Sequence, residues 1–252
     1  MPPMTKLAFQ THGDPANPAV LMLHGFMSSN AQWLPNLAAM TANRFLVTTE
    51  LWGHGDSPLP EAEQFSTQAY TAQFEQIRET LGIERWHTVG QSYGAGVIIR
   101  YALACPTRVL SVVATNSRSA FGQLVAGEEK SRSLPADADL RKLPYHPIHA
   151  RRFPDEVKEA LVASADRMST VAVDRGGLLG RNLNCIDVLG DLEMPLLITN
   201  GRYEKSFQPE LDNLKQRYPQ LKVADLEGGH SVNIEAAADF NSAVLKFQDR
   251  AG

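Results

Sequence analysis

The chain has 252 residues, of which 43% are hydrophobic and 21% are charged, and its formal net charge at pH 7 is −4. This balance is typical of a globular protein, and the absence of a basic stripe argues against nucleic acid as a partner. No apolar run is long enough to span a bilayer, so no membrane partner is expected.

The chain length suits one α/β domain that carries one insertion. The N-terminal residues lack the apolar run of a signal peptide, and two cysteines are too few to indicate a disulfide framework. We therefore expect a cytoplasmic location.

Short apolar runs alternate with helical stretches along most of the chain. Strands that are buried on both faces of a parallel sheet are continuously apolar, and several of these runs are. Thr5–Gln10 is predicted to add an early antiparallel strand. The other predicted strands are Ala19–Leu23, Phe45–Thr49, His87–Gly90, Val109–Ala114, Leu196–Thr199 and Lys222–Leu226. The predicted helices are Ala31–Thr41, Thr67–Leu81, Tyr93–Ala104, Pro209–Arg217 and Ala236–Phe247. The alternation predicts an α/β fold with a mostly parallel sheet flanked by helices.

The alternation stops between Ser117 and about Asp187, where no strong strand signal occurs. Leu134–His149 is typical of a loop or short helices, and Pro154–Ala172 is typical of a helix with proline in its first turn. Because the segment follows a strand whose carboxyl end should face the active site, it is a candidate lid. A large surface loop is the alternative.

This interpretation divides the chain into two parts. Residues 1–117 and 187–252 form the core domain, and residues 118–186 form the lid.

The strongest chemical signal is Gly90-Gln91-Ser92-Tyr93-Gly94, which matches the G-x-S-x-G pattern. A predicted strand leads into this segment and a predicted helix follows it. In such a strand-to-helix turn the serine hydroxyl is raised above the sheet, and the glycines let neighbouring backbone approach closely. Ser92 is therefore the predicted nucleophile.

Four motifs in this order resemble the α/β-hydrolase superfamily, in particular its small lidded serine carboxylesterases. They are Leu23-His24-Gly25-Phe26, Gly53-His54-Gly55-Asp56-Ser57, the segment Gly90–Gly94, and Gly228-Gly229-His230. The resemblance implies the α/β-hydrolase fold, with a helical lid inserted after the sixth strand. At the end of the second main strand the family usually carries aspartate, whereas this chain has Glu50.

The resemblance also assigns the partners of Ser92. His230 is expected to be the general base, since a serine hydroxyl needs a neighbouring imidazole to take its proton. Glu204 occupies the position of the acid, three residues after Gly201. The nearest rival carboxylates stand in less suitable places, two of them before the predicted strand and one within the next helix: Asp187, Asp191 and Asp212.

Backbone amides are expected to form the oxyanion hole, one from Tyr93 after the nucleophile and one from Phe26 after the His-Gly pair. Four apolar residues are candidates for binding the acyl group, and they are equally well explained as ordinary core contacts: Met27, Phe121, Leu124 and Val125.

Three further features carry no assigned role at this stage. His146 and His149 are separated by Pro147, and no third metal ligand accompanies them. Arg151 and Arg152 would suit an anionic substrate, although an exposed pair on a lid is the commoner case. Glu235 resembles a structural carboxylate of the family.

These residues predict a serine hydrolase that cleaves small carboxylic esters of short to medium acyl chain through an acyl-enzyme intermediate. No cofactor or metal is expected, because the chain supplies nucleophile, base, acid and oxyanion donors. The same residues also suit a C–C bond hydrolase, a lyase like that of the menaquinone pathway, or a binding and signalling protein with slow turnover.

Overall fold

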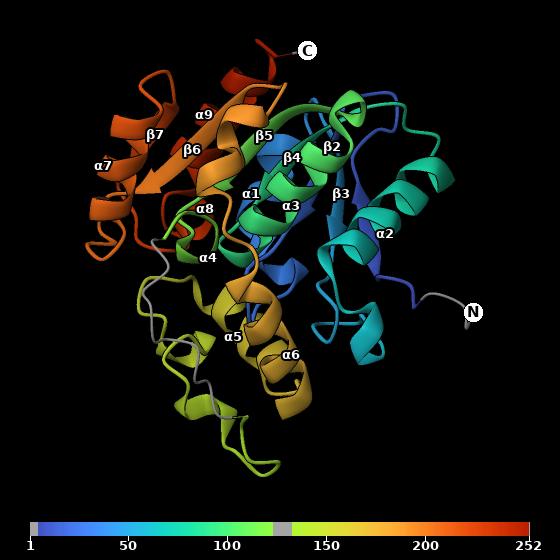
Figure 1. Ribbon diagram of the computed structural model, residues 1–252, viewed down its shortest axis with the longest axis vertical. Coiled ribbons are helices and arrows are strands. Elements are labelled where there is room, and N and C mark those ends of the chain that lie inside the picture. Colours follow the sequence, from blue (N-terminus) through green and yellow to red (C-terminus); the bar gives the residue numbers. More distant parts are fainter. Residues whose placement is uncertain (1–4, 123–132, 252) are drawn as a thin grey trace.

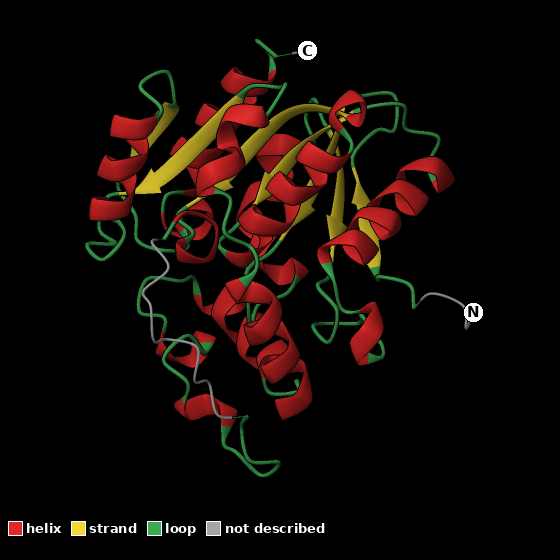
Figure 2. Cartoon of the chain, in the orientation of Figure 1, coloured by secondary structure: helices red, strands yellow, loops and turns green. Residues whose placement is uncertain are grey.

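The computed structural model describes residues 5–122 and 133–251, and within them seven strands form one sheet in the order β1-β3-β2-β4-β5-β6-β7 (Figures 1 and 2). The first strand pairs antiparallel with β3, and the other neighbouring pairs are parallel. The strands are β1 (Phe9–His12), β2 (Ala19–Leu23), β3 (Phe45–Thr49), β4 (Trp86–Gly90), β5 (Val109–Thr115), β6 (Leu196–Gly201) and β7 (Lys222–Leu226).

Helices cover both faces of this sheet (Figure 2). Those with at least one full α-helical turn are α1 (Leu34–Met40), α2 (Thr67–Thr80), α3 (Tyr93–Ala104), α4 (Arg118–Phe121), α5 (Asp155–Ala165), α6 (Thr170–Arg181), α7 (Gln208–Arg217), α8 (Val232–Glu235) and α9 (Ala237–Gln248). Short 3₁₀ turns complete the connections. No helix in the described ranges is long and apolar enough to cross a membrane.

The apolar runs are continuous because alternate side chains of each strand enter two different cores. All five residues of β2 are buried. Val20 belongs to the same apolar cluster as Phe240 of α9, whereas Leu21 belongs to the cluster of Phe74 of α2. Successive side chains of a strand point to opposite faces, so a sheet covered on both sides favours apolar residues at most positions, and the buried polar ones, such as Thr88, are hydrogen-bonded.

The predicted elements differ from the structure mainly at their ends. The early strand lies at Phe9–His12 rather than Thr5–Gln10, because Phe9 pairs with Thr49 of β3. The helix predicted over Ala31–Thr41 begins with a 3₁₀ turn over Asn30–Trp33 before α1.

The insertion follows β5, the fifth strand in the described part of the chain, whereas the resemblance implied a position after the sixth strand. The single helix predicted over Pro154–Ala172 is divided into α5 and α6. The break lies before Ser169, whose hydroxyl accepts a hydrogen bond from the amide of Ala172 (3.1 Å) and so caps α6. Figure 1 shows α5 and α6 side by side, below the sheet.

Candidate active site

Ser92 lies in a tight turn between β4 and α3. Its backbone has φ 50° and ψ −113°, a strained conformation for a residue with a side chain. The turn can pack against the neighbouring backbone because Gly94 has no side chain. A Cβ at this position would lie 2.5 Å from the carbonyl oxygen of Leu23. The amide of Ser92 donates to Thr115 Oγ1 at the end of β5 (3.0 Å). These contacts fix the serine at the carboxyl edge of the sheet.

The predicted Ser92, His230 and Glu204 lie in one hydrogen-bonded chain. His230 Nε2 lies 2.8 Å from Ser92 Oγ, and His230 Nδ1 lies 2.9 Å from Glu204 Oε1. Gln91 Nε2 donates to the carbonyl of His230 (3.1 Å) and ties the histidine loop to the turn that carries the serine. Residues from three distant parts of the sequence thus meet with the spacing that proton transfer requires.

Glu204 is held by a residue that sequence analysis did not assign. Asn116 follows β5, and its Nδ2 donates to Glu204 Oε2 (2.7 Å). Asn116 Oδ1 also accepts from the amide of Gly201 (3.0 Å), so the same side chain orients the strand end that precedes the acid. The available signal was its place, since it follows the strand that neighbours β6 in the sheet.

The pKa of Glu204 is lowered, so its carboxyl group stays ionised at a lower pH than an ordinary glutamate. Burial raises its pKa, but hydrogen bonds from His230 and Asn116, together with the charges of His230 and Arg118, outweigh burial and lower the pKa overall. A negative charge beside Nδ1 favours the tautomer of His230 that leaves Nε2 free to accept the serine proton.

The rival carboxylates lie elsewhere. Asp187 forms an ion pair with Arg217 (2.7 Å) in a 3₁₀ turn that precedes β6. Asp191 ends the same turn, and Asp212 lies within α7. None of the three takes part in the hydrogen-bonded chain of His230.

The amides of Phe26 and Tyr93 stand without a hydrogen-bond acceptor among the described residues. Tyr93 is the first residue of α3, where backbone N–H groups have no partner within the helix. The loop that carries Phe26 is held in place by buried polar side chains. Gly25 N donates to Gln32 Oε1 (3.3 Å), and Met27 N donates to His54 Nε2 (3.1 Å).

His54 is a buried histidine of the Gly53–Ser57 motif, and no role was predicted for it from the sequence. Its Nδ1 lies 3.0 Å from the carbonyl of Trp52, and its Nε2 accepts from Met27. Burial and the neighbouring His24 lower the pKa of His54 to about 3. The ring is therefore neutral, and a neutral ring is what allows Nε2 to act as an acceptor. Met27 itself has a positive φ of 52°, so this loop is held in a conformation that needs such support.

His24 braces the same loop from the sheet side. Its Nδ1 lies 2.7 Å from the carbonyl of Gly25, and its Nε2 accepts from the amide of Leu51 (3.1 Å). Glu50, at the position where the resemblance led us to expect aspartate, lies 2.8 Å from His24 Nε2 and accepts a hydrogen bond from the amide of Asn30 (3.0 Å). The longer carboxylate reaches across the base of the loop, and Gly55 leaves the space that it fills.

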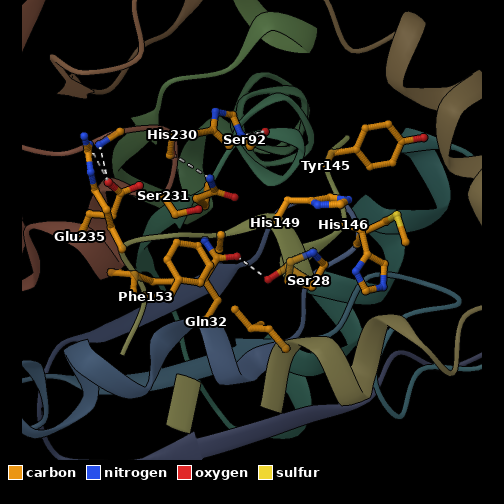
Figure 3. Close-up of a pocket in the computed structure, with 18 of the residues that line it drawn as sticks. Ser28, Gln32, Ser92, Tyr145, His146, His149, Phe153, His230, Ser231 and Glu235 are labelled. Atoms are coloured by element: carbon orange, nitrogen blue, oxygen red, sulfur yellow. Dashed lines mark hydrogen bonds and ion pairs between the residues drawn. The ribbon is translucent and has the colours of Figure 1, made fainter. Parts of the chain in front are cut away.

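A cavity of about 440 Å³ opens beside Ser92 and His230. Figure 3 shows Tyr145, His146 and His149 on one side of it, with Ser231 and Glu235 on the other. The first three belong to the insertion, which thus forms part of the wall. None of them had been assigned to the site, because a loop predicted from prolines gives no indication of which way its side chains point.

The four predicted acyl-binding residues have different outcomes. Met27 lines the cavity. Phe121 does not; it is fully buried in the core, where its ring lies 6.3 Å from that of Phe207, because α4 turns it toward α7. Leu124 and Val125 lie outside the described residues.

Comparison with known proteins agrees with this fold. The model of the alpha/beta hydrolase fold family matches residues 18–237, and the chain belongs to this family. It is 28% identical over 104 residues to the carboxylesterase YbfK of Bacillus subtilis, covering 41% of this chain and 35% of that protein. It is 31% identical over 110 residues to the monoacylglycerol lipase abhd6-B of Xenopus laevis, covering 42% and 33%. The chain thus matches about a third of the length of these relatives.

Among solved structures, MenH from S. aureus is similar with a TM-score of 0.78 and 20% identity, and the match covers 98% of this chain and 99% of that one. At this identity the likeness concerns the fold.

Proposed function

We propose that this protein is a serine carboxylesterase that hydrolyses esters of short to medium acyl chain, with Ser92, His230 and Glu204 as its catalytic residues. The observation that carries the proposal is the continuous hydrogen-bonded chain from Ser92 Oγ through His230 to Glu204. The relatives named as a carboxylesterase and a monoacylglycerol lipase support ester hydrolysis.

In the first half of the reaction, Ser92 Oγ attacks the ester carbonyl while His230 Nε2 takes its proton. The carbonyl oxygen becomes an oxyanion, which accepts hydrogen bonds from the amides of Phe26 and Tyr93. The intermediate collapses, the C–O bond to the alcohol breaks, and His230 returns the proton to the leaving oxygen. An acyl-enzyme and a free alcohol result.

Water completes the cycle along the same path. It attacks the acyl carbonyl while His230 takes one of its protons, the same amides hold the second oxyanion, and collapse releases the carboxylic acid. The proton returns from His230 to Ser92 Oγ. Glu204 stays ionised throughout and stabilises the positive charge on His230 at each stage.

The cavity is at the small end of the range for ligand sites, which favours short and medium acyl chains. We further propose that residues 118–186 act as a lid over a core domain of residues 1–117 and 187–252. The support is that Tyr145, His149 and Phe153 of this segment line the cavity that contains Ser92.

Steady-state hydrolysis of p-nitrophenyl esters, from acetate to palmitate, tests the proposal. We expect a maximum of kcat/KM among the short or medium chains, and loss of kcat by on the order of 10⁴ to 10⁶ in Ser92→Ala. A Ser92→Ala variant that retains a tenth of the activity would refute the assignment of the nucleophile. If no ester is hydrolysed, the C–C hydrolase, lyase and slow-turnover binding alternatives replace the esterase.

A further inference from the structure

Two neighbouring arginines of the insertion, Arg151 and Arg152, line the cavity that contains Ser92. We propose that this cavity selects esters that carry a free carboxylate elsewhere in the molecule, and that Arg151 binds this carboxylate. The inference rests on the proposed ester hydrolysis and names the substrate class of the same site.

The charges around the cavity do not balance. Arg151, Arg152 and Glu235 are the side chains of Arg, Lys, Asp or Glu that line it in the described part of the chain. Glu235 is already engaged: its Oε2 accepts from the amide of Gly229 (3.0 Å) and lies 3.4 Å from Arg152 Nη1. Arg152 and Glu235 therefore offset each other, and the charge of Arg151 is left over.

Arg151 itself makes no ion pair or hydrogen bond through its side chain within residues 5–122 and 133–251. Arg152, by contrast, also lies over the ring of Tyr203, with its guanidinium carbon 4.8 Å from the ring centre. A guanidinium presents its N–H groups as a planar fork that matches both oxygens of a carboxylate. The free member of the pair is therefore the one placed to receive an anion.

Both neighbours of Arg151 are held by contacts, Ala150 through its backbone carbonyl and Arg152 through its side chain. Lys158 Nζ of α5 donates to the carbonyl of Ala150 (2.7 Å), and the next residue, Arg152, is tied to Glu235. Anchoring of these neighbours lowers the entropy lost when the side chain is ordered by a ligand. An arginine on an unsupported loop would lack this advantage.

The remaining wall suits the part of the substrate that joins the ester to the carboxylate. Phe153, Leu161 and Ile234 provide apolar surface. His146 also lines the cavity, and burial lowers its pKa despite the nearby Asp166, so it adds a neutral polar group rather than a further cation. The cavity thus combines an apolar wall, one unbalanced cation and the serine, which is the arrangement that a half-ester of a dicarboxylic acid requires.

A matched pair of esters tests this inference. Mono-p-nitrophenyl adipate carries a free carboxylate, and the corresponding p-nitrophenyl methyl adipate has the same acyl chain without the charge. We expect the wild-type enzyme to show kcat/KM at least about tenfold higher for the charged ester, a difference of about 1.4 kcal/mol. In Arg151→Gln this ratio should fall about tenfold, mainly through KM of the charged ester, and charge reversal in Arg151→Glu should lower it further.

Arg167→Gln is the control. Arg167 is another exposed arginine of the insertion; it donates to the carbonyl of Ala163 (3.2 Å) and does not line this cavity. Arg167→Gln makes the same change in net charge as Arg151→Gln. Its ratio of kcat/KM for the charged ester to kcat/KM for the uncharged ester should equal that of the wild type. A ratio near one in the wild-type enzyme, or an equal fall in both variants, would overturn the inference while leaving ester hydrolysis intact.

Binding separates the two proposals if turnover is absent. Calorimetric titration of Ser92→Ala with monomethyl glutarate, and of Ser92→Ala combined with Arg151→Gln, measures charge selection without hydrolysis. We expect binding to the first and at least tenfold weaker binding to the second. Equal affinities, or no binding to either, would contradict the carboxylate site regardless of the catalytic result.

Discussion

Glu204 receives hydrogen bonds on both carboxylate oxygens, from His230 on one side and from Asn116 on the other. A glutamate has one methylene more than the usual aspartate and therefore more rotamers to restrict. Asn116 restricts them, and it also holds the strand end at Gly201. The longer acid is thus compatible with a precisely oriented imidazole because a neighbouring strand supplies the support.

Exchange of the acid should separate Glu204 from its nearest rival. We expect Glu204→Gln to lower kcat on the order of 10⁴-fold, since the amide no longer stabilises the imidazolium and can favour the wrong tautomer. Asp187→Asn should leave kcat close to the wild-type value, because Asp187 is an exposed partner of Arg217. The reverse ranking in steady-state kinetics would move the role of the acid elsewhere.

His54 should make the protein sensitive to acid. Its folded pKa of about 3 lies below the usual histidine pKa of 6.5, so between these pH values the unfolded state binds a proton that the folded state does not. The contribution of neutral His54 to the free energy of unfolding is complete above pH 6.5. It decreases as the pH falls toward 3, with a slope that approaches about 1.4 kcal/mol per pH unit.

The test is urea unfolding of wild type and His54→Gln at several pH values between 7 and 4 (roughly the range over which a normal histidine charges). The glutamine offers an acceptor for Met27 N but no titrating group. The free energy of unfolding of the variant should fall less steeply with acid. Parallel curves would show that His54 does not titrate between the folded and unfolded states as its burial implies.

At the level of elements, α6 of the insertion packs directly on the loop that carries Phe26. A Cβ on Gly176 would lie 2.3 Å from the ring of Phe26, whereas a Cβ on Gly177 would meet nothing within 4 Å. The ring of Phe26 is also stacked on Tyr93, with centres 5.5 Å apart, so it has little freedom to withdraw. The insertion and the proposed oxyanion hole are thus mechanically connected.

Two neighbouring substitutions in α6 test this connection. Gly176→Ala should push Phe26 aside and lower kcat about tenfold, a fraction of the effect of losing a whole oxyanion donor. Gly177→Ala makes the same chemical change on the exposed side, and should retain activity while stabilising the helix by about 0.5–1 kcal/mol. Equal activity in the two variants would mean that packing of α6 on Phe26 does not position its amide.

At the level of the whole molecule, the outer surface of the insertion is mixed in character. Its large exposed apolar residues within the described ranges are Tyr145, Val171 and Leu178. Exposed charged residues, including Arg141, Lys142 and Arg167, lie on the same segment. A lid that opens on a lipid surface needs a broad apolar face.

We therefore expect no activation by an oil–water interface. When the concentration of p-nitrophenyl butyrate or of a longer ester is increased past its solubility limit, the rate should change smoothly. It should not jump when an emulsion forms. A maximum at the longest chains together with such a jump would make the protein a lipase.

Much of this molecule is readable from local pattern. Short apolar runs predicted the parallel strands because a strand that is buried on both faces consists mostly of apolar residues. Gly90-Gln91-Ser92-Tyr93-Gly94 predicted the turn around Ser92 because a close backbone approach requires glycine at fixed offsets. The roles expected of Glu204 and His230 came from the resemblance to the α/β-hydrolase family, and the two side chains lie within 3 Å of each other.

Other features depend on contacts between residues far apart in the chain. Asn116 orients Glu204 across 88 positions, and this contact follows only from the order of the strands in the sheet, which brings the ends of β5 and β6 together. The burial of Phe121 and the wall formed by Tyr145 and His149 depend on how the segments that carry them pack on the rest of the molecule. Local pattern records the properties of an element, but the direction in which an insertion folds depends on which distant surfaces it can cover, and only the tertiary structure contains that information.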